Sequence, residues 1–328
     1  MIQKAYLNYL KQYHPQHIEH YYKRKEKKDY IVNEFSCLDE NDYIEQIKMK
    51  DIIVRDFLKQ YVNDIIAKEP FPLFNKIEIE TINQCNNTCS FCPVNVFADI
   101  RVHKTMSMEL FIKIISELKN MKYAGAINLF SNNEPLLEPF LLERLKYARI
   151  NLPDAYIFIY TNGILLTPEK LLDLLPYVDY IHINNYHSKP ELLNGHKKLQ
   201  QVLMENNISE DKVEIHLRNK NECLSTRAGQ APNRIKKSNL ESICILPFSQ
   251  IVIRPDGNIS FCCNDAYGQF SLGNVSTESL KDIWYGEKFE KNRINMLKGR
   301  LCQIPCDKCD MLFMPLACEK NNTKVDKL

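Results

Sequence analysis

The stretch Lys76-Ile-Glu-Ile-Glu-Thr-Ile82 is followed almost at once by Cys85-Asn-Asn-Thr-Cys89-Ser-Phe-Cys92. The first run alternates apolar and charged side chains, which is typical of a β-strand. The three cysteines behind it can supply thiolates, the usual protein ligands of iron–sulfur clusters. Three thiolates can hold three irons of a cubane and leave the fourth iron open to a small molecule. Two other interpretations stay open, namely a fragment of a zinc site and cysteines buried in a core, although structural zinc normally takes four ligands.

The totals of the chain exclude several classes of protein. Its 328 residues are 45% hydrophobic and 26% charged, which allows a large core and more than one small domain. The formal net charge of +2 argues against a general nucleic-acid binder, which needs an excess of Lys and Arg. No apolar stretch approaches the roughly 18–20 residues of a membrane-spanning helix. The N-terminus lacks the hydrophobic block of a signal peptide. We therefore expect a cytoplasmic protein without nucleic-acid or membrane partners.

The 12 cysteines indicate metal or redox chemistry rather than disulfides, because the chain shows no export signal. Beyond the first loop, most of them gather in the last quarter of the chain. These are Cys244, Cys262, Cys263, Cys302, Cys306, Cys309 and Cys318.

The pattern divides the chain into three parts. Residues 1–72 are highly charged with apolar residues at helical spacing, which predicts a helical N-terminal extension that packs on the main domain; contact with a partner is the alternative. From residue 73, strand-like and helical runs alternate, which predicts a parallel sheet with helices outside. Strands are expected at 76–82, 126–130, 155–160, 179–183, 213–217 and 248–254.

Five or six such units fit an α/β fold, a partial (β/α)6 TIM-like barrel over residues 73–240. A small cysteine-rich domain follows over 241–328. Barrels bind ligands at the carboxyl ends of their strands. The cysteine loop follows the first strand and so lies at that end.

Two further motifs follow the second and third expected strands. The first is Ser131-Asn-Asn-Glu134-Pro135, and the second is Thr161-Asn162-Gly163. Both compositions also favour ordinary turns, so their position at strand ends is what makes them candidates for a binding site.

Together these motifs resemble the radical S-adenosylmethionine (SAM) superfamily. Its CxxxCxxC loop matches Cys85, Cys89 and Cys92, including an aromatic residue, Phe91, before the last cysteine. The resemblance implies a [4Fe–4S] cluster whose open iron binds SAM. An electron from that cluster splits SAM into methionine and a 5′-deoxyadenosyl radical, which removes a hydrogen atom from the substrate.

The resemblance also implies SAM contacts at the strand ends. The 131–135 motif is similar to the family's Gly-Gly-Glu-Pro, with Asn in place of both glycines, and this departure leaves the backbone geometry open. Arg218 could pair with the SAM carboxylate or equally form a surface salt bridge. The expected cofactor contacts are Phe91, Asn133, Glu134, Thr161, Asn162, Asn184 and Arg218.

The C-terminal cysteines resemble the SPASM and twitch extensions of the same superfamily. This implies one auxiliary [4Fe–4S] cluster on Cys244, Cys262, Cys306 and Cys309. The spacing departs from the full SPASM pattern, so Cys302 and Cys318 remain candidates for a second auxiliary cluster and Cys263 is taken as a packing residue. A zinc ribbon stays open as an alternative, because four thiolates also satisfy zinc.

We expect a radical SAM oxidoreductase that dehydrogenates a small polar metabolite such as a sugar or aminocyclitol. By resemblance to the aminocyclitol dehydrogenases, Arg227 is the candidate catalytic base. An electron donor such as flavodoxin or ferredoxin is the expected partner. Maturation of a ribosomally made peptide, by thioether crosslinking or epimerisation, is the first alternative. A non-catalytic iron–sulfur or zinc protein is the second.

Overall fold

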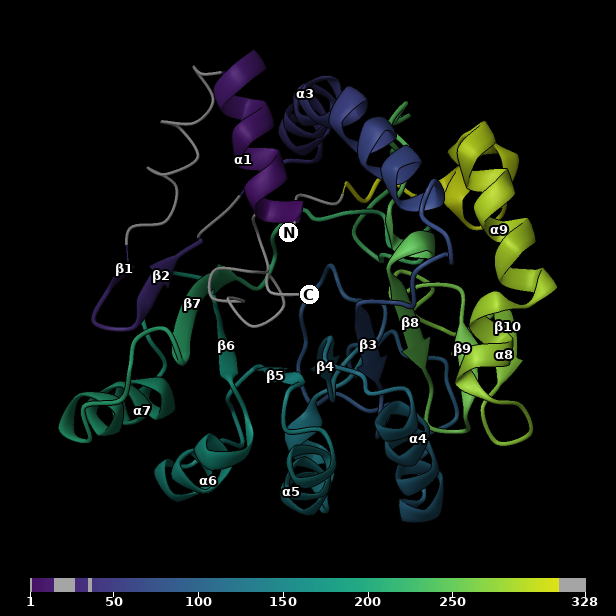
Figure 1. Ribbon diagram of the computed structural model, residues 1–328. Coiled ribbons are helices and arrows are strands. Elements are labelled where there is room, and N and C mark those ends of the chain that lie inside the picture. The colour runs from purple at the N-terminus through teal and green to yellow at the C-terminus, as the bar shows by residue number, and fades with distance from the viewer. Residues whose placement is uncertain (1, 15–26, 35–36, 313–328) are drawn as a thin grey trace.

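A computed structural model of the protein describes residues 2–14, 27–34 and 37–312. Its centre is a parallel arrangement of five strands joined by four α-helices that lie on one side of the sheet (Figure 1). The five strands are β3 (Lys76–Ile79), β4 (Ala126–Asn128), β5 (Tyr156–Thr161), β6 (Tyr180–His187) and β7 (Val213–Asn219). The helices between them are α4 (Met108–Asn120), α5 (Leu141–Asn151), α6 (Pro168–Leu174) and α7 (Asn194–Glu205).

The sheet continues beyond both edges of this unit. The α/β class is confirmed, but the strand expected at 248–254 pairs in parallel with β3 rather than following β7. The complete order is β1-β2-β7-β6-β5-β4-β3-β8-β9-β10. The added strands are β1 (Lys27–Lys28), β2 (Ile31–Asn33), β8 (Gln250–Ile253), β9 (Asn258–Ser260) and β10 (Ser271–Asn274).

The spacing of apolar residues predicted a helical N-terminal extension. The structure shows that the extension also contains strands. Its helices are α1 (Ile2–Tyr13) and α3 (Glu40–Ile66), and β2 between them pairs in parallel with β7. Asp39 caps α3 by accepting a hydrogen bond from the Asn41 amide at 2.8 Å. Because one of its strands belongs to the main sheet, the extension is integrated into the fold.

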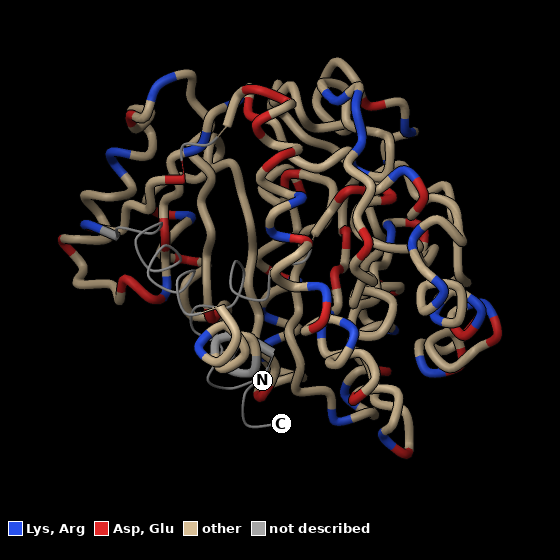
Figure 2. Tube along the Cα trace, turned by 90° about the horizontal axis from the view of Figure 1, so that it is seen from above, with Lys and Arg blue, Asp and Glu red and all other residues tan. Residues whose placement is uncertain are grey.

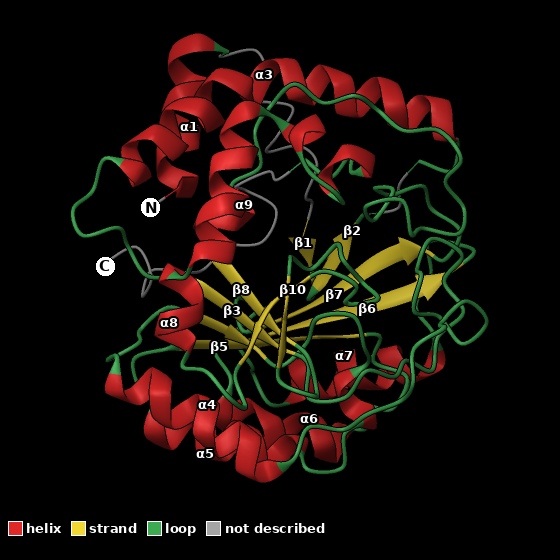
Figure 3. Cartoon of the chain, turned by 90° about the vertical axis from the view of Figure 1, so that its right-hand side faces the viewer, coloured by secondary structure: helices red, strands yellow, loops and turns green. Residues whose placement is uncertain are grey.

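The first and last parts of the chain share a hydrophobic cluster on the side of the sheet away from α4–α7 (Figures 1 and 3). Val54 and Leu58 of α3 lie in it together with Phe248 and with Met296 of α9. The C-terminal helices are α8 (Leu280–Tyr285) and α9 (Glu287–Lys298). The extension thus packs against the cysteine-rich region, and the sheet continues across the proposed boundary near residue 240.

The two faces of the central strands differ in chemistry. Ile77, Ile127 and Ile157 are register partners on three neighbouring strands, are fully buried, and pack in the core that includes residues of α4 and α5. Their sequence neighbours face the other way because successive side chains of a strand alternate. Glu78 and Asn128 therefore lie on the inner face of the curved sheet, on the side away from α4 and α5.

Basic and acidic residues are interspersed over the molecule (Figure 2). Among the described residues, no helix combines the length and the apolar character needed to cross a bilayer.

Candidate functional site: two cysteine sets joined by a polar network

The cysteine loop begins six residues after β3 ends, and its own backbone holds it together. The Cys92 amide donates to the Cys89 carbonyl at 3.1 Å. The Asn95 side-chain amide donates to the carbonyls of Cys89 and Cys92 at 3.0 and 2.7 Å. Phe91 is buried and packs against Tyr186, with the ring centroids 5.7 Å apart. The loop is therefore folded around its three thiols.

These three thiols are free and lie close to one another. Burial, together with the neighbouring Glu134 carboxylate and Cys92 thiol, raises the pKa of Cys85 to about 12. Burial also raises the pKa of Cys89, with contributions from Cys92 and Cys85. Clustered thiols that form no disulfide suit a metal group, because a bound cation displaces their protons and binds the thiolates.

No three His, Cys, Asp or Glu side chains among the described residues stand close enough to share a single metal ion. A cubane does not need that convergence, since each of its thiolates binds a different iron. The donor set of Cys85, Cys89 and Cys92 therefore fits an iron–sulfur cluster.

The two strand-end motifs meet at this loop. The Glu134 carboxylate accepts hydrogen bonds from Thr161 Oγ1 at 2.6 Å, from the Asn162 amide at 2.7 Å and from the Leu136 amide at 3.1 Å. The Asn162 side-chain amide donates to Asn86 Oδ1 at 2.8 Å. The structure thus brings Glu134, Thr161 and Asn162 together beside the cysteine loop, as expected for one binding site.

Glu134 mainly ties these loops together. Its carboxylate is already occupied by three donors, and burial raises its pKa to about 7 despite those hydrogen bonds. Asn133 differs, because its Oδ1 accepts from the Ser131 amide at 2.9 Å while its buried Nδ2 has no partner in the described structure. A buried donor without an acceptor is costly. Asn133 is therefore the stronger candidate for direct contact with a ligand, and contact by Glu134 stays a prediction.

Asn184 and Arg218 lie in strands rather than after them. Asn184 Oδ1 contacts His182 Nε2 at 3.0 Å on the inner face of β6. Arg218 forms ion pairs with Glu222 at 2.5 Å and Glu34 at 3.3 Å. Two carboxylates therefore compensate its charge, which leaves its predicted pairing with a SAM carboxylate without structural support.

The second cysteine set also converges. Burial raises the pKa of Cys262, and the thiols of Cys263, Cys309, Cys306 and Cys244 raise it further, so these sulfurs are neighbours. Each is free of disulfide bonds. Cys302 is exposed, with its thiol directed to the Lys298 carbonyl at 3.6 Å. Cys318 lies outside the described residues, and a second auxiliary cluster remains a prediction without a test.

Arg227 connects the two cysteine sets. Its guanidinium donates to Asn132 Oδ1 and, at 3.4 Å, to the Cys263 carbonyl. Burial raises the pKa of Cys92, and the nearby Arg227 charge is the largest effect opposing that rise. Arg227 and Ala228 both adopt positive φ angles, 49° and 55°, which are unfavourable for residues other than glycine. Arg227 acts as a donor in these contacts, and its role as the catalytic base stays a prediction.

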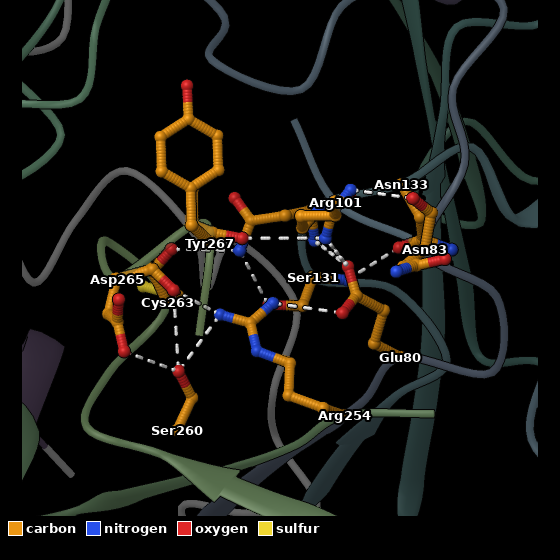
Figure 4. Close-up of polar contacts among 12 residues, drawn as sticks. Glu80, Asn83, Arg101, Ser131, Asn133, Arg254, Ser260, Cys263, Asp265 and Tyr267 are labelled. Atoms are coloured by element: carbon orange, nitrogen blue, oxygen red, sulfur yellow. Dashed lines mark hydrogen bonds and ion pairs between the residues drawn. The ribbon is translucent and has the colours of Figure 1, made fainter. Parts of the chain in front are cut away.

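A buried charge network around Glu80, which the motifs did not reveal, contacts Asn132 of this connection (Figure 4). Glu80 follows β3 and is fully buried between Arg101 at 3.1 Å and Arg254 at 2.9 Å. Arg101 also donates to the carbonyls of Asn83 and Asn132 at 2.6 and 2.9 Å. The alternation of 76–80 places Glu80 on the inner face, and that was its only signal in the sequence.

Two family models match the parts of the chain that form this site. The model of the radical SAM superfamily matches residues 79–214, and that of the iron–sulfur cluster-binding domain SPASM matches residues 244–310. The chain contains a radical SAM domain followed by a SPASM domain. The two matched regions of this radical SAM protein contain the two cysteine sets described above. SAM and iron–sulfur clusters are thus its cofactors.

One curated relative and two solved structures are similar to this radical SAM protein over most of its chain. The S-adenosyl-L-methionine-dependent 2-deoxy-scyllo-inosamine dehydrogenase of Niallia circulans is 29% identical over 229 residues, which are 69% of this chain and 88% of the relative. A crystal structure of BtrN in complex with AdoMet and 2-DOIA is 26% identical, with a TM-score of 0.63 over 74% of this chain and 94% of BtrN. An open conformation of BtrN, 24% identical with a TM-score of 0.56 over 73% and 94% of the two chains, shares the fold.

Proposed function

We propose that the protein is a radical SAM dehydrogenase that oxidises an alcohol of a small cyclitol or sugar by two electrons. The observation that carries the proposal is the convergence of two free-thiol sets on one polar connection, Arg227 with Asn132 and the Cys263 carbonyl. The 29% identity to an inosamine dehydrogenase supports the substrate class.

The two cysteine sets support an assignment of one cluster to each. Cys85, Cys89 and Cys92 would hold the cluster that cleaves SAM, while Cys244, Cys262, Cys306 and Cys309 would hold one auxiliary cluster. When bound, these groups supply the radical that removes a hydrogen atom and the acceptor for the second electron. A flavodoxin- or ferredoxin-type protein would supply the electron that starts each turnover.

Residues of the chain position the cofactors and the substrate for this reaction. Glu134 holds the ends of β4 and β5 against each other through Thr161 and Asn162, which fixes the loops expected to contact SAM. Arg227 places a positive charge between the cysteine sets, where it can donate to the oxygen of a substrate alcohol. A half-buried donor of this kind acts more strongly than one in water, because the protein lowers the surrounding dielectric.

The test is turnover with a defined substrate. The enzyme, reconstituted with iron and sulfide without oxygen, is incubated with SAM, dithionite and 2-deoxy-scyllo-inosamine, here called the inosamine probe. We expect 5′-deoxyadenosine and a ketone in equal amounts. The Cys244→Ala variant should still release 5′-deoxyadenosine but form much less ketone. Absence of 5′-deoxyadenosine from the wild-type enzyme would refute the radical SAM assignment, and its release without any ketone would refute the substrate class.

A further inference from the structure

Two buried hydrogen-bond acceptors on neighbouring strands lack donors. Glu78 of β3 and Asn128 of β4 are register partners and are 5% and 2% exposed. Glu78 Oε2 and Asn128 Oδ1 have no hydrogen-bond partner in the described structure. Buried polar atoms are nearly always paired, because an unmade hydrogen bond in the interior is costly. Two such atoms at paired positions indicate a ligand that brings its own donors.

Both side chains belong to the inner face of the sheet. Ala126, two residues before Asn128, packs with Phe158 and Tyr180 on that face. The Lys76 ammonium, two residues before Glu78, lies 5.9 Å from the centroid of the Phe158 ring. Residues two apart in a strand share a face, so the unpaired oxygens point to the side of the sheet away from the helices.

Aromatic rings flank these acceptors. Phe158 is the register partner of Asn128 on β5, and its ring centroid lies 5.5 Å from that of Tyr160. Tyr160 in turn lies 4.4 Å from His182. Tyr160 and His182 are only half-buried, so solvent reaches this face. Apolar and aromatic walls with a few fixed polar groups are typical of small-molecule sites, and a saturated ring with outward hydroxyls suits them.

The charges favour a neutral donor over an ammonium group. Glu78 Oε1 forms an ion pair with the Lys76 ammonium at 2.9 Å, so its charge is already compensated. Oε2 still accepts a hydrogen bond, but a second ammonium here would be repelled by Lys76. The buried Nε of Arg227 also lacks a partner, and Arg227 and Glu78 both lie within electrostatic range of the Cys263 thiol. The acceptors thus lie near the connection between the cysteine sets.

We propose that Glu78 and Asn128 form a substrate subsite that accepts hydrogen bonds from two neighbouring hydroxyls of a polyhydroxylated ring. The inference rests on the proposed function, since it describes how that enzyme holds its substrate. It assigns specificity to two residues outside the cysteine and SAM motifs.

The test measures binding, without turnover. Calorimetric titration of the reconstituted, unreduced enzyme with SAM uses the inosamine probe, analogues that each lack one hydroxyl, and one that lacks the amine. The Glu78→Gln variant should bind the probe about tenfold to a hundredfold more weakly, as expected for a lost hydrogen bond to a charged group. Asn128→Ala should weaken binding about fivefold.

Glu214→Gln is the matched control. Glu214 is an inner-face carboxylate on β7 that already accepts from the Tyr180 hydroxyl at 2.6 Å and contacts His216 at 3.1 Å. This variant should keep the affinity within about threefold of wild type. Iron content and release of 5′-deoxyadenosine show that each variant is folded and loaded.

Removing one particular hydroxyl should weaken binding to wild type at least about tenfold, and this penalty should largely vanish in Glu78→Gln. Three results would overturn the proposal: equal losses in Glu78→Gln and Glu214→Gln, a coupling to the amine instead of a hydroxyl, or no binding of any probe to wild type. Ketone formation by the wild type tests the proposed function separately. Ketone without the coupling to Glu78 overturns the subsite alone, whereas no binding and no ketone overturn both.

Discussion

The carboxylate of Glu80 accepts a hydrogen bond from Arg254 Nη1 at 2.9 Å. This ion pair joins the end of β3, where the first cysteine loop begins, to the end of β8, where the SPASM region folds back. Arg254 also donates to Ser260 Oγ at 3.0 Å, and Ser260 donates to Asp265 Oδ2 at 3.0 Å. One buried acid therefore fixes the position of the auxiliary region relative to the SAM-binding strands.

Replacing Glu80 by Ala should destabilise the protein by about 3–5 kcal/mol, because Arg101 and Arg254 would remain buried without their shared carboxylate. Urea unfolding of the metal-free protein measures this. Glu241→Ala provides the control, since Glu241 pairs with Arg55 at an exposed position and should cost at most about 1 kcal/mol. Equal losses in the two variants would show that the network does not stabilise the fold.

Glu134 should make stability depend on pH. Burial raises its pKa from 4.5 to about 7, so the folded state binds the proton more tightly than the unfolded state. The resulting stabilisation is complete below about pH 4.5 and is lost as the pH rises through about 7. Between pH 5.5 and 8 the wild type should lose about 2 kcal/mol relative to Glu134→Gln. Urea unfolding at both pH values checks this, and a pH-independent difference between the two proteins would contradict it.

The two cysteine sets should load iron independently. Wild type should bind about eight irons per chain, while Cys85→Ala and Cys244→Ala should each retain about four. Iron analysis and electron paramagnetic resonance measure this, and addition of SAM should change the spectrum of the cluster left in Cys244→Ala only. Cys302→Ala is the control and should keep the full iron content, because Cys302 is exposed. A loss of about half the iron in Cys302→Ala would instead make Cys302 a ligand.

Gly163→Ala should destabilise the protein by more than about 1 kcal/mol. Gly163 has a φ angle of +70°, and an added Cβ would lie 2.7 Å from Ile183 Cγ2 and would also collide with His196. Gly195→Ala is the matched control in α7, where an added Cβ meets nothing within 4 Å. It should be neutral or stabilising by about 0.5–1 kcal/mol. Thermal unfolding of both variants distinguishes backbone strain from a general effect of glycine replacement.

The sequence was most informative where chemistry depends on local spacing. Cys85, Cys89 and Cys92 lie within eight consecutive residues, and alternation located the start of β3 at Lys76 correctly. Thr161 and Asn162 also came directly from a short motif. Their hydrogen bonds to Glu134 follow once parallel strands place their carboxyl ends side by side.

The sequence did not predict which strands and which charged residues pair over long distances along the chain. The side of the sheet on which β8 pairs depends on the whole topology, so alternation alone could not place it beside β3. The same holds for β2, which is only three residues long, and for Arg101 and Arg254, which meet at Glu80 from positions far apart in the chain. The unpaired oxygens of Glu78 and Asn128 become visible only when every neighbouring donor is known.

The pairing of β8 with β3 has a consequence for how the protein can be divided. A chain cut near residue 240 would retain all residues of the first cysteine loop yet leave the backbone groups of β3 without their neighbour on one side. An open strand edge of that kind invites association with other chains. The SAM-cleaving half would therefore be expected to aggregate when produced alone, and the two halves are best regarded as one folding unit.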